Sequence, residues 1–182
     1  DMLVNFWNVL LDDSIGLSKE MESIEPTNVE YKRIKEVLMS LHETQEMLKD
    51  WSTDYYKRDD IISLSNVIKA AYYYFNHNCS YGPGYLGWGS SVYLNKDKWD
   101  NMIESVRNFE CPNLLVGKMS FDESIRVHDG DFLYLDPPYY LGNDIDNRMH
   151  KGMYPMKNID VHHRGFDHEL LRDLLLEHDG DF

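Results

Sequence analysis

The sequence is poor in basic residues. Only 18 of its 182 residues are lysine or arginine, whereas 32 are aspartate or glutamate, so the formal net charge is −14. This charge argues against a general binder of polyanions, because nucleic acids and anionic lipids are repelled by a largely acidic surface.

Long apolar runs and abundant cysteine are also missing. The chain has no apolar run of about 18 residues and no basic segment followed by an apolar one at its start, which disfavours a membrane span or a secretory signal. Its two cysteines, Cys79 and Cys111, lie far apart without metal-type spacing. We expect both to be reduced, buried thiols, in a cytoplasmic protein.

The charge is distributed unevenly along the chain. Residues 1–50 carry 11 acidic and 5 basic groups, residues 51–118 carry 7 of each, and residues 119–182 carry 14 and 6. The middle segment also holds 13 of the 24 aromatic residues. A nucleic acid would meet the least repulsion and the most stacking surface there, although aromatic side chains more often belong to a core.

The most informative motif is Asp136-Pro137-Pro138-Tyr139, which directly follows the apolar run at residues 132–135. The two prolines fix φ at their own positions and keep the preceding aspartate extended. The pattern predicts a stiff loop at the end of a strand. The alternative is an ordinary turn that closes a strand.

Hydrophobic periodicity predicts several helices, with short strands in the C-terminal third. Thr27-x-x-Glu30 indicates a capping box, Asp167 is a suitable N-cap, and the first helix is expected to begin without a cap. The predicted helices comprise residues 3–11, 27–50, 60–76, 96–108, 121–125 and 166–177; the predicted strands comprise residues 113–116 and 131–135, with another beginning near residue 180. A glycine- and aromatic-rich loop is expected at residues 80–89, and a mobile polar loop at 140–165. Alternating strand and helix indicate an open α/β sheet, in which ligands bind beyond the carboxyl ends of strands.

The order of these motifs resembles that of Dam-like, site-specific adenine DNA methyltransferases. Four stretches carry the resemblance, at residues 3–7, 70–82, 120–139 and 166–171, and only the catalytic motif is highly specific. The resemblance implies an α/β fold: a fragment of a Rossmann-like class I methyltransferase sheet with an inserted, mainly helical DNA-recognition lobe. Residues 1–12 and 112–182 would form the partial catalytic domain, and residues 13–111 the inserted lobe.

The implied reaction transfers a methyl group from S-adenosylmethionine to the N6 amino group of an adenine in duplex DNA. That nitrogen is a poor nucleophile, because its lone pair is delocalised into the ring. Asp136 would accept one of its N–H groups and the carbonyl of Pro137 the other, which stabilises the developing positive charge. Pro138 would stiffen the loop, and Tyr139 would stack on the base after it has flipped out of the helix.

The resemblance also implies cofactor and DNA contacts. Phe121 would pack on the adenine of S-adenosylmethionine with Ser120 beside it, and Asp136 would approach the methionine amino group. The resemblance gives Asn76, Tyr81 and Gly82 as candidate DNA-binding residues, and Tyr85 and Trp88 are further candidates because they lie in the glycine- and aromatic-rich loop. The partners would be double-stranded DNA and the cofactor, bound by a monomer in the cytoplasm of a bacterium or of a host infected by a phage or virus, in the setting of restriction and modification.

The sequence departs from the family pattern at several positions. The Phe-x-Gly-x-Gly loop that approaches the cofactor is absent, which predicts an inactive fragment whose cofactor loop lies upstream. His77 stands where a basic residue is usual, Tyr81-Gly82 where Asn-Gly is usual, and Ser120 where an acidic residue is frequent. The sequence therefore does not decide whether the segment containing His77 and Tyr81-Gly82 contacts DNA phosphates.

Other functions were weighed against adenine methylation. A non-catalytic DNA- or protein-binding remnant would keep the fold without the cofactor loop. Cytosine-amino methyltransferases usually carry Ser in place of Asp136, and glutamine methyltransferases Asn. A metal-dependent hydrolase would use His162, His163 and His168 with Asp160 or Asp167, but these spacings match none of the helix-borne zinc patterns.

Overall fold

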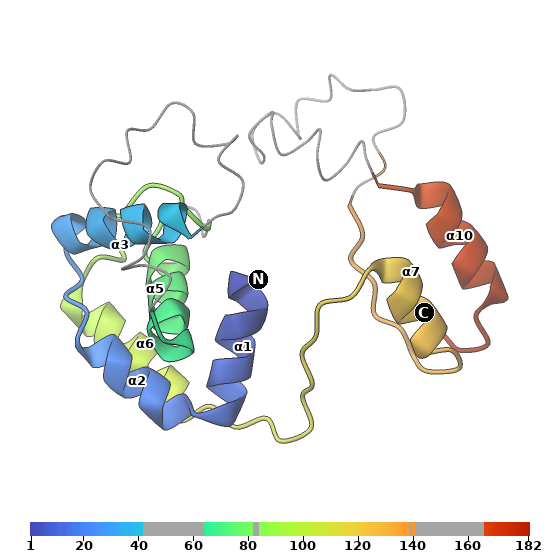
Figure 1. Cartoon of the computed structure of the whole chain (residues 1–182), viewed down its shortest axis with the longest axis horizontal. Helices are drawn as coiled ribbons and strands as arrows, with labels where there is room; N and C mark the ends of the chain where they lie inside the picture. The colour runs from blue at the N-terminus through green and yellow to red at the C-terminus, as the bar shows by residue number, and fades with distance from the viewer. Residues whose placement is uncertain (42–63, 82–83, 139, 141–165) are drawn as a thin grey trace. The chain divides into compact units, whose positions relative to one another are not determined.

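The computed structural model describes residues 1–41, 64–81, 84–138, 140 and 166–182. Helices dominate these ranges (Figure 1). They are α1 (Met2–Asp12), α2 (Ser14–Glu22), α3 (Asn28–Ser40), α5 (Asn66–Asn78), α6 (Lys96–Arg107), α7 (Phe121–Val127) and α10 (His168–Glu177). The chain forms two compact units, Asp1–Lys118 and Met119–Phe182. None of the helices in the described ranges is long and apolar enough to cross a membrane.

Side-chain caps explain where two of the predicted helices begin. Thr27 accepts a hydrogen bond from the N–H of Glu30 at 3.2 Å, and Asp167 accepts one from Leu170 at 2.9 Å. Each bond satisfies one of the N–H groups that a helix start leaves without an internal partner. Both residues are confirmed as N-caps, but the capping box at Thr27 is formed in one direction only, because the N–H of Thr27 donates to the carbonyl of Glu25 and the Glu30 carboxylate pairs with Arg33.

Caps also account for two differences from the predicted helices. Asp1 accepts hydrogen bonds from the N–H groups of the first turn of α1, so the expectation of an uncapped start was wrong. Ser65 caps α5 through the N–H of Ile68 at 3.2 Å, and α5 therefore begins at Asn66 rather than near residue 60. Helix α3 is described to Ser40, and the predicted continuation to residue 50 lies outside the described residues.

The core of the first unit is built around α5, which packs against α1, α2 and α3, while α2 also packs on α6. The ring of Phe75 meets Trp99 edge-on with centroids 5.0 Å apart, and Phe6 stacks on Tyr74 at 5.1 Å. Aromatic pairs of this kind add to the stabilisation that apolar burial supplies. Much of the aromatic middle segment is therefore core.

The second unit has a small core of its own. Helices α7 and α10 pack together and bury Ile125, Leu171 and Leu174. Beyond the helices, the described residues of this unit form irregular chain, which includes Asp136, Pro137 and Pro138.

None of the three predicted strands is formed, and the chain near residue 180 is irregular as well. Residues 113–116 and 131–135 are irregular, and Leu115 is 94% exposed. A strand needs a neighbour for its N–H and C=O groups, and within the described ranges the strand pairing is limited to an isolated antiparallel bridge between Ser80 and Gly89. The family's sheet stays a prediction.

The cysteines also differ from expectation in part. Cys79 is buried as predicted, and burial raises the pKa of its thiol to about 12. Cys111 is exposed, because it lies in the irregular chain that follows α6 rather than in an element packed on the core.

Candidate functional site

The catalytic motif lies in irregular chain of the second unit. Asp136 is exposed, Pro137 and Pro138 are half-buried, and Tyr139 lies outside the described residues. A solvent-exposed carboxylate on a proline-stiffened segment is accessible to a ligand and loses little conformational freedom on binding one.

A buried histidine anchors the chain that leads to this motif. The side chain of His178 has no exposed surface; its Nε2 lies 2.9 Å from the carbonyl oxygen of Asp131, and its Nδ1 lies 3.2 Å from the carboxylate of Asp129. The N–H of Leu133 donates to the carbonyl of Asp181 at 2.9 Å. These contacts tie the segment before the motif to the chain that follows α10.

A series of ring contacts connects the motif with the predicted cofactor residues. The ring of Tyr140, which directly follows the motif, meets His168 edge-on at 5.2 Å. His168 contacts Phe166 at 4.8 Å, and Phe166 contacts Phe121 at 4.7 Å, all measured between centroids. The structure thus places Phe121 and the residue after the motif in one aromatic cluster, which sequence reasoning did not foresee.

Ser120 stands at the N-terminus of α7, beside Phe121. Its hydroxyl donates to the carboxylate of Glu123 at 3.0 Å and does not cap the helix backbone. Ser120 is exposed and Phe121 half-buried. A hydroxyl, an aromatic ring and an acidic group therefore occur together at this helix end.

One candidate DNA-facing residue, Asn76, lies in α5, and the other four lie in the chain after α5, which we call the aromatic loop and define as residues 79–90. Its two ends are joined by the Ser80–Gly89 bridge and by a hydrogen bond from the N–H of Tyr81 to the carbonyl of Trp88 at 2.6 Å. Tyr81 is 81% and Trp88 79% exposed. The loop therefore carries two exposed aromatic side chains on residues whose backbones are joined by a hydrogen bond.

Two other candidates, Asn76 in α5 and Tyr85 in the aromatic loop, are packed inside the first unit. Asn76 is completely buried, which is incompatible with a direct DNA contact, and its carboxamide oxygen accepts the N–H of Leu86 at 2.7 Å. Tyr85 is half-buried and packs on the ring of Tyr73 at 5.1 Å, and burial raises the pKa of its hydroxyl. Gly82 lies outside the described residues.

Comparison with protein families matches residues 1–180 to the D12 class N6 adenine-specific DNA methyltransferases. The chain belongs to this family. Searches of curated proteins and of solved structures found no match. The match includes both the catalytic motif and the aromatic loop, and it confirms the resemblance seen in the sequence.

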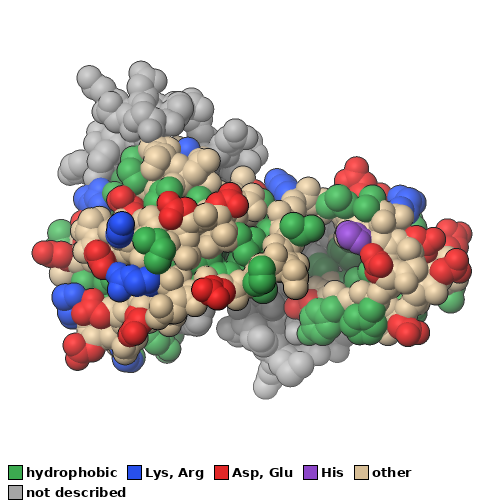
Figure 2. Space-filling view, turned by 90° about the horizontal axis from the view of Figure 1, so that it is seen from below, with side chains coloured by type: hydrophobic (Ala, Val, Ile, Leu, Met, Phe, Trp, Pro, Cys, Tyr) green, Lys and Arg blue, Asp and Glu red, His purple; other side chains and the backbone are tan. Residues whose placement is uncertain are grey.

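The surface charge of this methyltransferase is mixed around the first unit. On the face shown in Figure 2, basic side chains of that unit are interspersed with acidic ones and form no continuous basic area. One lysine contacts the aromatic loop, since Lys35 donates to the carbonyl of Gly87 at 3.0 Å; the ammonium of Lys98 lies 5.1 Å from the ring centre of Tyr93, which follows the loop. Stacking surface rather than concentrated charge distinguishes this part of the unit.

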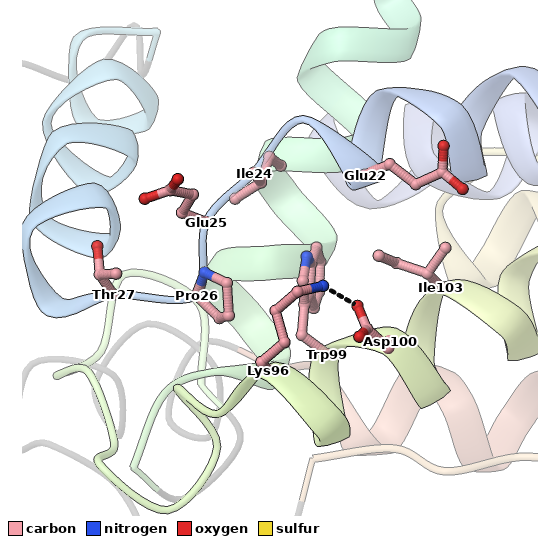
Figure 3. A pocket seen from close by; sticks show the side chains of 9 residues that line it. All are labelled: Glu22, Ile24, Glu25, Pro26, Thr27, Lys96, Trp99, Asp100 and Ile103. Carbon is pink, nitrogen blue, oxygen red and sulfur yellow. Dashed lines mark hydrogen bonds and ion pairs between the residues drawn. The ribbon is translucent and has the colours of Figure 1, made fainter.

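The methyltransferase also has a groove of about 450 Å³ that contains none of the predicted site residues (Figure 3). Ile24, Pro26 and Trp99 supply apolar lining, and Lys96 pairs with Asp100 across 2.6 Å at its edge. Sequence periodicity assigned Trp99 to a helix but could not indicate a groove between α2, α3 and α6.

The metal-site alternative receives no support from the described residues, among which no group of three or more His, Cys, Asp or Glu side chains could hold a metal ion. Of the histidines considered for it, His168 belongs to the aromatic cluster, and His162 and His163 lie outside the described residues.

Proposed function

We propose that this protein transfers a methyl group from S-adenosylmethionine to the N6 amino group of adenine in double-stranded DNA. The observation that carries the proposal is the family match over residues 1–180, which contains Asp136-Pro137-Pro138-Tyr139. A monomer in the cytoplasm of a bacterium or of an infected host suits this reaction.

In the proposed reaction Asp136 accepts one N–H of the target amino group, and the carbonyl of Pro137 accepts the other. Both oxygens then lie where positive charge develops as the nitrogen bonds to carbon. Tyr139 stacks on the base, which must leave the helix because its amino group cannot be approached in line within a base pair. The exposure of Asp136 supports this role, since a flipped base arrives from solvent.

The residue types at the second unit suit the proposed cofactor. S-adenosylmethionine carries an ammonium group, which Asp136 would bind, and an adenine, which Phe121 would contact with Ser120 beside it. When bound, this cofactor supplies an electrophilic methyl group on sulfur. The protein's own contribution is to bind and orient both reactants. The ring contacts from Phe121 to Tyr140 would hold the cofactor-binding residues and the chain next to Asp136 in fixed positions relative to each other.

The aromatic loop is the proposed DNA interface. Tyr81 and Trp88 flank the Ser80–Gly89 bridge and are both exposed, and exposed aromatic rings stack on nucleic-acid bases regardless of sequence. Asn76, being buried, is not proposed as a direct contact, and Tyr85 has less exposed surface to offer than its neighbours.

The decisive experiment incubates the intact protein with duplex DNA and radiolabelled S-adenosylmethionine, then digests the DNA and identifies the labelled nucleoside. We expect N6-methyladenine. Asp136→Ala should lower the rate by roughly a hundredfold or more, because it removes an acceptor that acts in the transition state. Asp181→Asn changes another exposed carboxyl group of the same unit and should retain the wild-type rate.

Three outcomes would contradict the proposal. Label in cytosine or in protein would show that adenine is not the substrate. An Asp136→Ala variant with the wild-type rate would show that the carboxylate takes no part in the reaction. Tight binding of duplex DNA by a protein that neither binds S-adenosylmethionine nor transfers methyl groups would favour the non-catalytic remnant. Cofactor binding is therefore measured separately by calorimetry, since the sequence has no Phe-x-Gly-x-Gly turn.

A further inference from the structure

The aromatic loop contains a strained residue that is held from within the core. Leu86 has φ of +58°, and it is the only non-glycine residue with positive φ in the described part of the chain. A side chain beyond Cβ makes this conformation unfavourable, so it persists only where surrounding contacts enforce it. The N–H of Leu86 donates to the carboxamide oxygen of Asn76 at 2.7 Å, across ten residues of sequence.

A second residue of the core holds the next position of the same turn. The hydroxyl of Tyr31, in α3, lies 3.2 Å from the carbonyl oxygen of Gly87 and 3.3 Å from that of Asn76, and it donates to one of them at a time. Tyr31 is buried, and its pKa is raised to about 12, mainly by burial, so it remains a donor at neutral pH. Lys35 donates to the same carbonyl of Gly87 at 3.0 Å.

The fixed turn leads directly to the exposed side chains of the loop. Trp88 follows Gly87, and Tyr81 is joined to Trp88 by the 2.6 Å backbone hydrogen bond. Both side chains are about four-fifths exposed, at 79% and 81%. The buried carboxamide of Asn76 is thus connected, through the Leu86–Gly87 turn, to the exposed side chains of Trp88 and Tyr81.

We propose that Asn76 and Tyr31 are positioning residues of the DNA interface: they hold the Leu86–Gly87 turn in its strained form, so that Trp88 and Tyr81 form a single preorganised stacking surface for duplex DNA. The inference rests on the proposed function for the identity of the ligand. Because the turn is already held in the free protein, binding does not have to meet the cost of ordering it. A residue with no exposed surface thereby affects DNA affinity.

The test is a double-mutant cycle on the intact protein, with DNA affinity measured by fluorescence anisotropy of a labelled duplex. Asn76→Leu removes the acceptor for Leu86 while keeping the number and branching of the side-chain heavy atoms, and Trp88→Ala removes the larger exposed ring. Each substitution should weaken binding about tenfold, and the double variant should bind almost as well as Trp88→Ala alone, because Asn76 acts through Trp88. Additive losses, or an unchanged affinity of Asn76→Leu, would overturn the proposal.

Two further variants separate positioning from general damage to the fold. Tyr31→Phe removes only a hydroxyl group and should weaken binding severalfold with its own coupling to Trp88→Ala. Adding Leu86→Gly to Asn76→Leu should recover part of the lost affinity, because glycine adopts positive φ without strain. A merely structural loss would not be relieved by a glycine in the loop, and no recovery would count against the proposal.

Hydrogen exchange in the absence of DNA distinguishes the two ways the idea can fail. Asn76→Leu and Tyr31→Phe should speed the exchange of the Leu86 and Trp88 amides and leave those of α1 unchanged. If exchange is unaltered, the turn is not held by these residues and the inference is wrong. If exchange speeds up while Trp88→Ala binds DNA normally, the turn is held as described but the DNA assignment of the loop is wrong.

Discussion

The indole N–H of Trp99 donates to the main-chain carbonyl of Met21 at 3.2 Å, and both side chains are buried. The bond joins α6 to the end of α2, where the Met21 carbonyl also accepts the N–H of Ile24 at 3.1 Å. Trp99 also lines the groove of Figure 3 and contacts Phe75. One side chain therefore joins three helices of the first unit.

Trp99→Phe should lower the free energy of unfolding of the first unit by about 2 kcal/mol, because the buried hydrogen bond of the indole N–H is lost and the smaller ring leaves a cavity. Urea denaturation followed by circular dichroism measures the change. Trp88→Phe, at a position 79% exposed, is the matched control and should alter stability little. Equal stability of the two variants would show that the Trp99–Met21 bond contributes nothing.

Gly89→Ala should destabilise the aromatic loop. A Cβ at this position would lie 2.9 Å from Cδ1 of Tyr31, a buried ring that cannot move aside freely. Overpacking of this kind costs about 1–3 kcal/mol, and the melting temperature should fall accordingly. At Gly117 a Cβ would meet nothing within 4 Å, so Gly117→Ala should melt like the wild type. A Gly89→Ala protein of wild-type stability would contradict the close approach.

Phe166→Ala should weaken cofactor binding if Phe121 contacts S-adenosylmethionine as proposed. The substitution removes the ring that lies between Phe121 and His168, and an aromatic pair contributes about 0.5–1.5 kcal/mol beyond its burial. We expect a several-fold higher Kd in calorimetry. Phe182→Ala removes an aromatic ring that is 65% exposed and should leave the Kd unchanged. An equal effect of both substitutions would exclude a specific role for the aromatic cluster.

Alkaline pH should destabilise the first unit. Burial raises the pKa of Cys79 from 9.0 to about 12, and that of Tyr31 from 10.0 to about 12. The unfolded chain therefore loses these protons first, so the contribution of these two groups to stability is constant well below pH 9 and falls as the pH rises toward 12, by at most about 1.4 kcal/mol per pH unit for each group. Urea titrations across this range measure it, and Cys79→Ala should remove the earlier part of the fall. A free energy of unfolding that rises with pH over this range would contradict the raised pKa values of these two groups.

Helix positions could be predicted from the sequence where a cap and a periodic apolar face agree. Thr27 and Asp167 are such cases, and α6 lies within one residue of its predicted limits. Helix α2 was missed, because residues 14–22 contain a glycine and few apolar positions. The predicted N-terminus of α5 was wrong because the apolar pattern extends ahead of Ser65. The Ser65 side chain caps the helix, so that α5 begins directly after it.

The strands and the surroundings of the catalytic motif could not be predicted in the same way. An apolar run such as residues 132–135 has the composition of a strand, but strand formation depends on a partner that periodicity does not supply. The motif itself was recognisable from its residue types. The contact of Tyr140 with His168 and the burial of Asn76 depend on tertiary packing, so no local pattern indicated them.

The contrast between the two thiols makes the protein suitable for site-specific labelling. Cys79 is buried with a raised pKa and should resist maleimides, whereas Cys111 is exposed on the irregular chain after α6. Since the sequence contains no third cysteine, a single fluorophore can be attached to the native chain at Cys111 without mutagenesis. An energy-transfer partner on a DNA duplex would then measure directly how far bound DNA lies from that point of the first unit.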